Sequence, residues 1–262
     1  MGKISAVINT LNEERNISDC ILSLAPFVDE ILICDMHSED KTVEIAKSLG
    51  AKCVLTKRHP YVEPARKVAI ENASNEWVLV LDADERMTEN LGKKLRNIAD
   101  SYEGVQVVKF WSLYWFFGDW VEHGGFFSGN WPRFFRKETY LSNYSEKELM
   151  VHKNFASLKG IKNTLQLSKK YYIRHYAYNS VDSYVTKTVA KYSLIEASNY
   201  FDERIPFRAS RLILNPAKEF FVRYLLKGGF RHGTRGLILS FLYSVYRFNV
   251  WANLWFLYQK EK

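Results

Sequence analysis

Cysteine is scarce in this chain of 262 residues, which contains only Cys20, Cys34 and Cys53. The number is odd, there is no CxxC pair, and no histidine stands at ligand spacing from a cysteine. Nothing in this pattern indicates a disulfide framework or a zinc site. Met1–Ile8 is too short and too strand-like for a secretory signal, so we expect a reducing cytoplasm.

A long uninterrupted hydrophobic run is also missing. A membrane-spanning helix needs about 20 predominantly apolar residues. The best stretch, Gly236–Tyr258, is broken by Arg247, Asn249 and Asn253. We therefore expect this segment to lie on a membrane or to pack on the protein body, and not to cross a bilayer.

Glycine-rich phosphate loops are absent as well. The first apolar run is not followed by GxGxxG, and the chain has no Walker A motif. This argues against a nicotinamide-dependent enzyme and against a P-loop nucleotidase. Any nucleotide would have to be held in another way, through acidic residues and a metal ion.

Acidic residues almost disappear from the end of the chain. Residues 204–262 contain 11 Lys and Arg but only 2 Asp and Glu, a net +9, whereas the whole chain has a net +8. The same segment holds 13 of the 40 aromatic residues. A basic, aromatic segment indicates an anionic partner, either a membrane or a nucleic acid. The alternative is a solvated basic face on an ordinary helical cap.

The first 85 residues alternate between short apolar runs and helical patterns. The strand-like runs are Lys3–Thr10, Glu30–Cys34, Lys52–Leu55 and Trp77–Leu81, and the helical patterns are Ile17–Leu24, Asp40–Leu49 and Pro64–Asn72. This alternation predicts an α/β fold whose mostly parallel sheet is covered by helices on both faces. Ligands of such sheets bind at the carboxyl ends of the strands. Three polar clusters fall there: Thr10–Glu13, Asp35–Asp40 and Asp82–Arg86.

These clusters carry the chemistry of the predicted site. Asp82 and Asp84 follow an apolar strand at a spacing of two, which would place both carboxylates on one face. Paired carboxylates attract Mg²⁺ or Mn²⁺, although the same DxD spacing also occurs in solvated turns. Asp35 would accept hydrogen bonds from a nucleoside, or it would serve only as a turn or helix-cap residue. Arg66 precedes the fourth strand and would meet phosphate.

The second half of the chain has a different character. Residues 110–136 are rich in tryptophan and glycine, and we expect a shaped loop there and not a regular element. Tyr184–Tyr200 has a helical pattern, and two apolar helices are expected over Ala217–Leu226 and Leu237–Leu257. The tryptophans would stack on sugar rings or belong to the core.

Several motifs, in order along nearly the whole chain, resemble glycosyltransferase family 2, which has the GT-A fold. The motifs are Asn9–Glu14, Asp35 before His37–Thr42, Pro64–Lys67 and Trp77–Glu85. Within the family, further motifs resemble the bacterial branch of the lipopolysaccharide inner-core glucosyltransferases. These are Phe117–Gly125, Arg133–Arg136, Val151–His152, Ile173–Tyr176 and the basic turn Gly228–Gly233.

The resemblance implies an inverting transfer of a sugar from a nucleoside diphosphate, with UDP-glucose favoured and Mg²⁺ or Mn²⁺ as cofactor. The implied binding residues for the nucleotide sugar are Thr10, Asn12, Glu13, Asp35, Arg66, Asp82, Gly124 and Gly125. Asp82 and Asp84 would hold the ribose and the metal-bound diphosphate. His175 would join the metal, or it would be a buried structural histidine.

An inverting transfer needs a general base that takes the proton of the acceptor hydroxyl. The resemblance implies an acidic residue directly after His152, but Lys153 stands there. A lysine is mostly protonated at neutral pH and replaces such a base poorly. We expect Glu148 to act as the base, with Glu122 as the second candidate.

The basic end of the chain is predicted to bind a membrane. Its candidate contacts are Arg223, Lys227, Arg231, Arg235, Trp251 and Trp255, because basic and aromatic side chains on amphipathic helices favour anionic bilayers. Nucleic acid is not expected, since no helix-turn-helix or RNP pattern occurs. The expected location is the cytoplasmic face of a bacterial inner membrane, with a lipid-linked saccharide as acceptor. The alternatives are transfer to a polyprenyl phosphate and a catalytically impaired adaptor of the same fold.

The predicted domain organisation follows from these assignments. Residues 1–203 would form the catalytic domain, divided into a nucleotide-sugar-binding half, 1–109, and an acceptor-binding half, 110–203. Residues 204–262 would form a C-terminal amphipathic helical extension that associates with the membrane.

Overall fold

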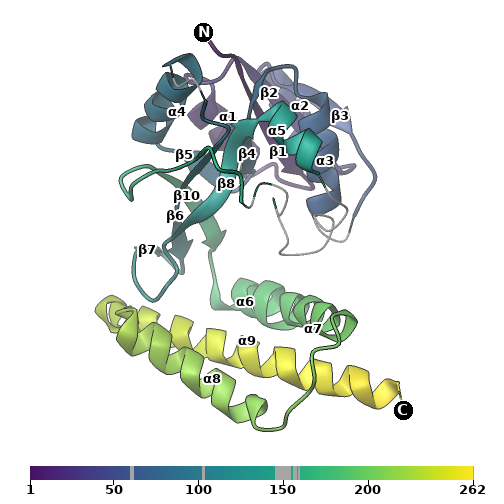
Figure 1. The fold of residues 1–262 in the computed structure, drawn as a ribbon, viewed down its shortest axis with the longest axis vertical. Coiled ribbons are helices and arrows are strands. Elements are labelled where there is room, and N and C mark those ends of the chain that lie inside the picture. Colours follow the sequence, from purple (N-terminus) through teal and green to yellow (C-terminus); the bar gives the residue numbers. More distant parts are fainter. Residues whose placement is uncertain (60–61, 102–103, 145–154, 156–157, 159, 262) are drawn as a thin grey trace. The chain divides into compact units, whose positions relative to one another are not determined.

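The computed structural model describes the chain except for residues 60–61, 102–103, 145–154, 156–157, 159 and 262. The described residues form two compact units (Figure 1). Unit 1 comprises Met1–Ser112 and Ser128–His175, and unit 2 comprises Leu113–Phe127 and Tyr176–Lys262. The functional division at residues 109 and 203 stays a prediction.

A mixed sheet provides the framework, with the strand order β3-β2-β1-β4-β8-β6-β10-β5. The strands with carboxyl ends at the predicted site are β1 (Ile4–Thr10), β2 (Glu30–Asp35), β3 (Lys52–Leu55) and β4 (Trp77–Asp82). The others are β5 (Glu85–Met87), β6 (Val107–Phe116), β7 (Asp119–Val121), β8 (Ser128–Arg136), β9 (Thr164–Gln166) and β10 (Tyr172–Tyr178). The first four pair in parallel, and β8 continues the sheet antiparallel to β4.

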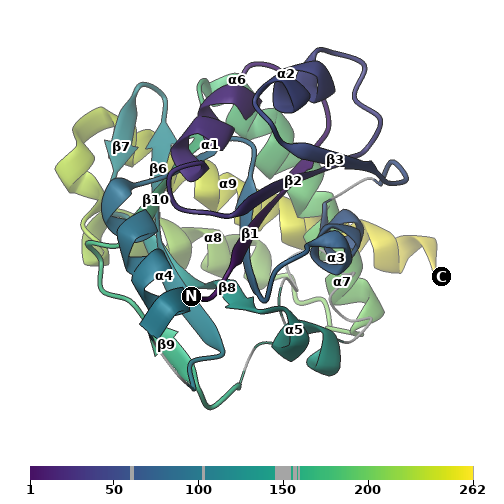
Figure 2. The same cartoon turned by 90° about the horizontal axis from the view of Figure 1, so that it is seen from above.

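Helices cover both faces of the parallel strands of unit 1 (Figure 2). One face packs on α1 (Ile17–Leu24), α2 (Thr42–Ser48) and α4 (Glu89–Ser101), and the other on α3 (Glu63–Asn72) and α5 (Lys137–Asn143). Strand residues alternate between the two cores: Ile4 and Ile8 enter the first, and Val7 enters the second. Every residue of β1 is buried, as a strand covered on both faces requires.

The predicted α/β class and the four early strands are confirmed. The expectation of an irregular loop over residues 110–136 is wrong, because β6, β7 and β8 occupy most of this region. Aromatic side chains favour pleated, half-buried strands, and this preference outweighs the neighbouring glycines. Gly118, with a φ of 93°, lies between β6 and β7, and Gly124 and Gly125, each with a φ of 76°, lie between β7 and β8.

Unit 2 is mainly helical. Its elements are α6 (Val181–Tyr184), a π-helical stretch Val185–Tyr192, α7 (Ser193–Asp202), α8 (Arg211–Phe221), a second π-helical stretch Val222–Leu226, a 3₁₀ turn Gly229–His232 and α9 (Gly233–Lys260). Leu239 and Val250 of α9 share a core with Phe116 and Tyr184. The helices predicted near the end of the chain are confirmed. The first begins earlier than expected, at Arg211, and becomes π-helical after Phe221, and α9 is longer than expected at both ends.

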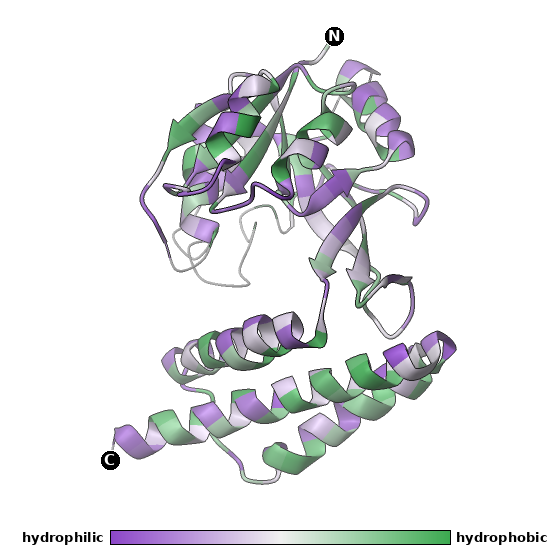
Figure 3. Ribbon diagram, turned by 180° about the vertical axis from the view of Figure 1, so that it is seen from behind, coloured by the Kyte–Doolittle hydropathy of each residue, from purple (hydrophilic) through white to green (hydrophobic). Residues whose placement is uncertain are grey.

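Among the residues that the structure describes, no helix is long and apolar enough to span a membrane. Figure 3 shows long hydrophobic stretches along both α8 and α9. These stretches are broken by polar residues, among them Arg247 near the middle of α9.

Candidate functional site

Asp35 is held rigidly at the carboxyl end of β2. The parallel register of β1 and β2 places Thr10 beside it, and Thr10 Oγ1 donates to Asp35 Oδ1 at 2.7 Å. The backbone N–H and hydroxyl of Ser38 donate to the same carboxylate at 2.8 and 2.6 Å. Asp35 therefore stabilises the turn after β2, and three hydrogen-bond donors fix the orientation of its side chain.

Polar contacts join the loops after β1 and β2. The Asn12 N–H donates to Ser38 Oγ at 2.9 Å, and the Glu39 N–H donates back to Asn12 Oδ1 at 2.8 Å. The Glu13 N–H donates to Thr42 Oγ1 at 2.7 Å. Because both loops are tied together, the residues predicted to bind the nucleoside form a fixed rim.

Asp82 lies between two arginines. Arg66 of α3 donates to Asp82 Oδ1 at 2.7 Å, and Arg133 of β8 approaches Oδ2 at 3.5 Å. Burial alone would raise the pKa of Asp82, but the charges of Arg66 and Arg133 outweigh burial and lower it. Both oxygens of the Asp82 carboxylate thus face guanidinium groups. Asp82 is therefore less suited to bind a metal ion than its DxD spacing implied.

Glu85 and Arg133 are charged residues of this cluster to which the sequence analysis gave no role. Glu85 is fully buried, forms an ion pair with Arg133 and accepts a hydrogen bond from the Asp82 N–H at 2.9 Å. Burial raises the pKa of Glu85, and Arg133 opposes this shift. One signal was present in the sequence, since Arg133 is a charged residue directly before the two apolar aromatic residues Phe134 and Phe135.

Asp84 and His175 lie together beside this buried pair. The antiparallel pairing of β10 with β5 sets His175 opposite Glu85, and His175 Nε2 is 3.3 Å from Asp84 Oδ2. Burial would lower the pKa of His175, but Asp84 and Glu85 outweigh it and raise it. Because β4 ends at Asp82, Asp84 belongs to the turn before β5. The alternation of side chains along a strand therefore does not put the two carboxylates on one face, as their spacing had predicted.

The donor set of Asp84 and His175 fits a divalent cation that also binds substrate oxygens. Their side chains keep 18% and 16% of their exposure, so one carboxylate and one imidazole remain partly open to solvent. Mg²⁺ is commonly held by one or two carboxylates together with phosphates of the substrate. In the described part of the chain, no group of three or more His, Cys, Asp or Glu side chains is arranged to hold a metal ion.

The predicted residues Gly124 and Gly125 belong to unit 2. The Gly124 N–H donates to the Lys227 carbonyl at 2.8 Å, and Arg223 Nη1 donates to the Gly124 carbonyl at 3.0 Å. Both glycines have a φ of 76°, a conformation that other residues adopt at a cost. Glu122 is exposed in the same unit, whereas Glu148 lies outside the described residues.

The predicted membrane residues differ in exposure. Trp251 is buried in a core with Ala197 and Leu254, so its ring is not available to a lipid surface. Arg223 lies over the rings of Phe126 and Tyr243, and only 11% of its side chain is exposed.

The remaining predicted membrane residues are more accessible. Arg235 forms an ion pair with Asp119 at 3.0 Å. Lys227, Arg231 and Trp255 are exposed. These last three are therefore the exposed members of the set, and Arg231 Nη1 also lies 3.1 Å from His123 Nε2.

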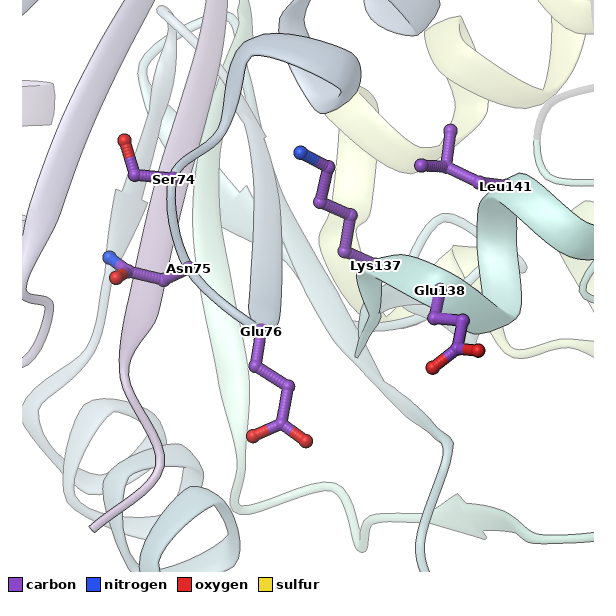
Figure 4. A pocket seen from close by; sticks show the side chains of 6 residues that line it. All are labelled: Ser74, Asn75, Glu76, Lys137, Glu138 and Leu141. Atoms are coloured by element: carbon purple, nitrogen blue, oxygen red, sulfur yellow. The ribbon is translucent and has the colours of Figure 1, made fainter.

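A pocket of about 370 Å³ lies away from the site, before β4 and after β8 (Figure 4). Lys137 lines it and donates to the carbonyls of Glu71 and Ala73 at 2.9 and 2.7 Å. These carbonyls end α3, so the lysine acts as a helix C-terminal cap. The lysine that lines this pocket therefore has a structural role.

Residues 5–164 match the family described as glycosyl transferase family 2. An uncharacterized glycosyltransferase of Rickettsia typhi is 39% identical over 102 residues, which are 39% of this chain and 35% of that protein. A similarly named protein of Rickettsia felis is 26% identical over 269 residues, covering 95% of this chain and 88% of its own length. The match thus spans about a third of the R. typhi relative and most of the R. felis relative.

Solved structures similar to the chain include glucosyl-3-phosphoglycerate synthase from Mycobacterium tuberculosis in complex with Mn²⁺, uridine diphosphate and glucosyl-3-phosphoglycerate. The sequence identity is 28%, the TM-score is 0.38, and the match covers 44% of each chain.

Proposed function

Because this chain belongs to glycosyl transferase family 2, we propose that it moves a hexosyl group from a nucleoside diphosphate to a hydroxyl group of a lipid-linked saccharide. The observation that carries this proposal is the cluster at the carboxyl ends of β1, β2 and β4. It combines a buried, oriented Asp35 with an arginine-bound Asp82 and an Asp84–His175 pair. Glucose and a lipopolysaccharide-core acceptor are favoured by the resemblance of the motifs between Phe117 and Tyr176.

The donor nucleoside binds along the rim formed by Thr10, Asn12, Glu13 and Asp35. Asp35 and Asp82 accept hydrogen bonds from its base and ribose. Arg66 contacts Asp82, and its guanidinium group binds the first phosphate of the donor that lies beside this carboxylate. Carboxylates and a guanidinium group here take the place of the missing glycine-rich loop.

Asp84 and His175 hold Mg²⁺ or Mn²⁺ in this proposal. The bound ion supplies positive charge that stabilises the departing diphosphate. Glu85 lies beside the imidazole of His175, with 3.3 Å between Nδ1 and Glu85 Oε1, and acts on it through charge because these two atoms form no hydrogen bond. Arg133 in turn neutralises Glu85, which keeps the buried cluster from accumulating negative charge.

In the transfer step, the acceptor oxygen attacks the anomeric carbon from the face opposite the diphosphate. The new C–O bond forms while the bond to the diphosphate breaks, and its electron pair leaves with the diphosphate. The proton of the acceptor hydroxyl passes to a carboxylate, for which Glu148 and Glu122 are the candidates. The configuration at the anomeric carbon is inverted. The enzyme would work as a peripheral protein at the cytoplasmic face of a bacterial inner membrane.

A transfer assay with radiolabelled UDP-glucose, Mn²⁺ and a bacterial lipid extract tests the proposal. We expect a labelled glycolipid, and we expect Asp84→Ala to lower its formation about 100-fold or more, because charge on the leaving group is no longer stabilised. Glu44→Ala removes an exposed carboxylate of α2 and is the matched control. Full turnover by the Asp84→Ala variant would refute the metal-binding role.

The same assay separates the alternative acceptors. Mild acid hydrolysis releases label from a polyprenyl phosphate sugar, and a glycan linkage survives it. Nucleotide binding without any turnover would instead indicate an adaptor of the same fold.

A further inference from the structure

Unit 2 exposes an unusual amount of apolar surface over its last two long helices. Six large side chains, Leu214 and Phe221 of α8 with Leu237, Phe241, Phe248 and Trp255 of α9, are between 42% and 63% exposed. We name this surface the α8–α9 face. The two helices pack side by side, so both contribute to one region of the unit.

The exposed side chains of α9 form one line along the helix. Positions 237, 241, 248 and 255 are separated by four, seven and seven residues, the spacing that repeats on one side of an α-helix. Another side of α9 buries Leu239, Val250 and Leu254. The helix is thus apolar on both sides, which is typical of a helix covered all round, although the described residues cover only one side.

Helix α8 also exposes large apolar side chains. Leu214 and Phe221 lie seven residues apart on its exposed side, and Leu225 and Leu226 continue the apolar surface beyond it with 50% and 81% exposure. Pro216 is the buried residue of α8. Exposed apolar patches of this extent mark sites of interaction with a protein or a membrane.

Charge distinguishes between these partners. Lys218 is exposed four residues after Leu214, and Lys227 and Arg231 are exposed in the connection between α8 and α9. The two acidic residues of 204–262 already have partners: Glu219 pairs with Arg223 at 3.5 Å and Glu261 with Arg204 at 2.8 Å. The surface around the α8–α9 face therefore has an excess of positive charge.

We propose that the α8–α9 face docks on an anionic phospholipid bilayer. Its apolar side chains enter the boundary between headgroups and acyl chains, and Lys218, Lys227 and Arg231 contact lipid phosphates. A second copy of the chain fits less well, because a symmetric contact would bring two strongly basic surfaces together. The helices lie on the bilayer and do not cross it, in keeping with the lack of a spanning helix among those described.

This docking does not depend on the proposed transfer reaction. Only the step from docking to a lipid-linked acceptor rests on the proposed function. The surface also differs from the membrane contacts expected from sequence: Trp251 and Arg223 are structural, and Phe241 and Phe248 take their place.

Co-sedimentation of the full chain with vesicles tests the proposal. The vesicles contain phosphatidylcholine with about 30 mol% phosphatidylglycerol, to supply negative surface charge. We expect the double substitution F241S/F248S to lower partitioning about tenfold or more, because two aromatic side chains no longer leave water. Leu55→Ser removes an apolar side chain of unit 1 that is at least as exposed as Phe241 and Phe248, and it should leave partitioning unchanged.

A charge variant gives the second readout. Lys218→Glu should weaken binding to the anionic vesicles, and added salt should reduce the difference between this variant and the wild type. On vesicles of phosphatidylcholine alone, binding of the wild type should be weaker by at least about threefold.

Three results would overturn the proposal. One is equal sedimentation of the wild type and F241S/F248S, and another is a wild type that does not bind the vesicles at all. The third is a dimer, seen by sedimentation velocity without lipid, that F241S/F248S dissociates, since the face would then join two copies. Asp84→Ala should bind vesicles like the wild type, so a failure of docking and a failure of sugar transfer are told apart.

Discussion

Glu85 is the most deeply buried charge of the candidate site. It has no exposure and depends on Arg133 as its counter-charge. Removing one partner of such a pair leaves an uncompensated charge in a low-dielectric interior. The pair therefore helps to orient its neighbour Asp82, and folding is sensitive to its loss.

We predict that Glu85→Ala destabilises the protein by about 3–5 kcal/mol, because buried Arg133 would lose its shortest carboxylate contact and keep only the longer one to Asp82, at 3.5 Å. Glu85→Gln retains an acceptor for the Asp82 N–H and should cost less. Urea unfolding followed by circular dichroism measures both values. A cost below about 1 kcal/mol for the alanine variant would mean that water or Asp82 replaces Glu85.

Glu30 predicts a pH dependence of folding stability. Burial raises the pKa of Glu30, but hydrogen bonds from Lys52, Ser5 and Ser74 outweigh burial and bring it to about 2, against an ordinary value of 4.5. The folded state thus holds the proton less tightly than the unfolded state. This contribution is present above about pH 4.5 and is lost as the pH falls toward 2.

Glu30→Gln should therefore lower stability at pH 7 by about 1–3 kcal/mol and flatten its decline in acid. Urea unfolding at a series of pH values between neutral and acidic gives both quantities. Parallel declines for the variant and the wild type would assign the acid sensitivity to other carboxylates.

At the scale of elements, α9 begins with an unusually close contact. A Cβ on Gly236 would collide with the carbonyl oxygen of Gly229 in the preceding 3₁₀ turn, and Gly229 itself lies against the Arg223 carbonyl. The turn can approach the helix only because both positions lack side chains. This contact fixes where α9 starts relative to the basic turn.

We predict that Gly236→Ala destabilises the protein by about 1–3 kcal/mol through overpacking. Inside a helix, replacing glycine by alanine usually raises stability by up to about 1 kcal/mol, so the predicted effect on stability has the opposite sign. Thr234→Ala, at an exposed position of the same helical turn, is the control and should change little. Thermal unfolding of the two variants decides the sign, and a more stable Gly236→Ala variant would contradict the packing argument.

At the scale of the whole molecule, charge is divided unequally along the chain. The acidic clusters of unit 1 face a nucleotide sugar and a cation in our proposal, and the positive excess belongs to residues 204–262. The net +8 of the chain thus describes neither part well. Binding of a small ligand by the acidic clusters should appear in the stability of the entire protein by mass action.

We predict that UDP-glucose with Mn²⁺ raises the melting temperature, since a ligand at about 100 times its Kd adds about 2.7 kcal/mol to native stability. The part of the shift that requires Mn²⁺ should disappear in Asp84→Asn. Differential scanning fluorimetry across several nucleotide sugars measures this. If none of them shifts the transition, the proposed donor class is wrong.

Much of unit 1 was predictable from the sequence, because its signals are local. Four apolar runs separated by helical patterns predicted the parallel strands, and the helix over Ile17–Leu24 was predicted to the residue. The polar residues at the strand ends, Thr10, Asp35 and Asp82, follow from the same pattern. Strand alternation and helical periodicity record burial directly, so no distant contact is needed to interpret them.

Other features were decided only by tertiary structure. Arg133 and His175 come from β8 and β10, and only sheet pairing brings them beside Asp82, Asp84 and Glu85. The strands over 110–136 were missed because part of their pairing is with more distant segments of the chain, β4 for β8 and β9 for β6. The local sequence pattern indicates that α8 and α9 are apolar and basic. Which side of each helix is covered, however, depends on packing against other elements. The sequence by itself thus determined the chemistry at the strand ends, and the fold determined which charges are paired and which apolar surface stays exposed.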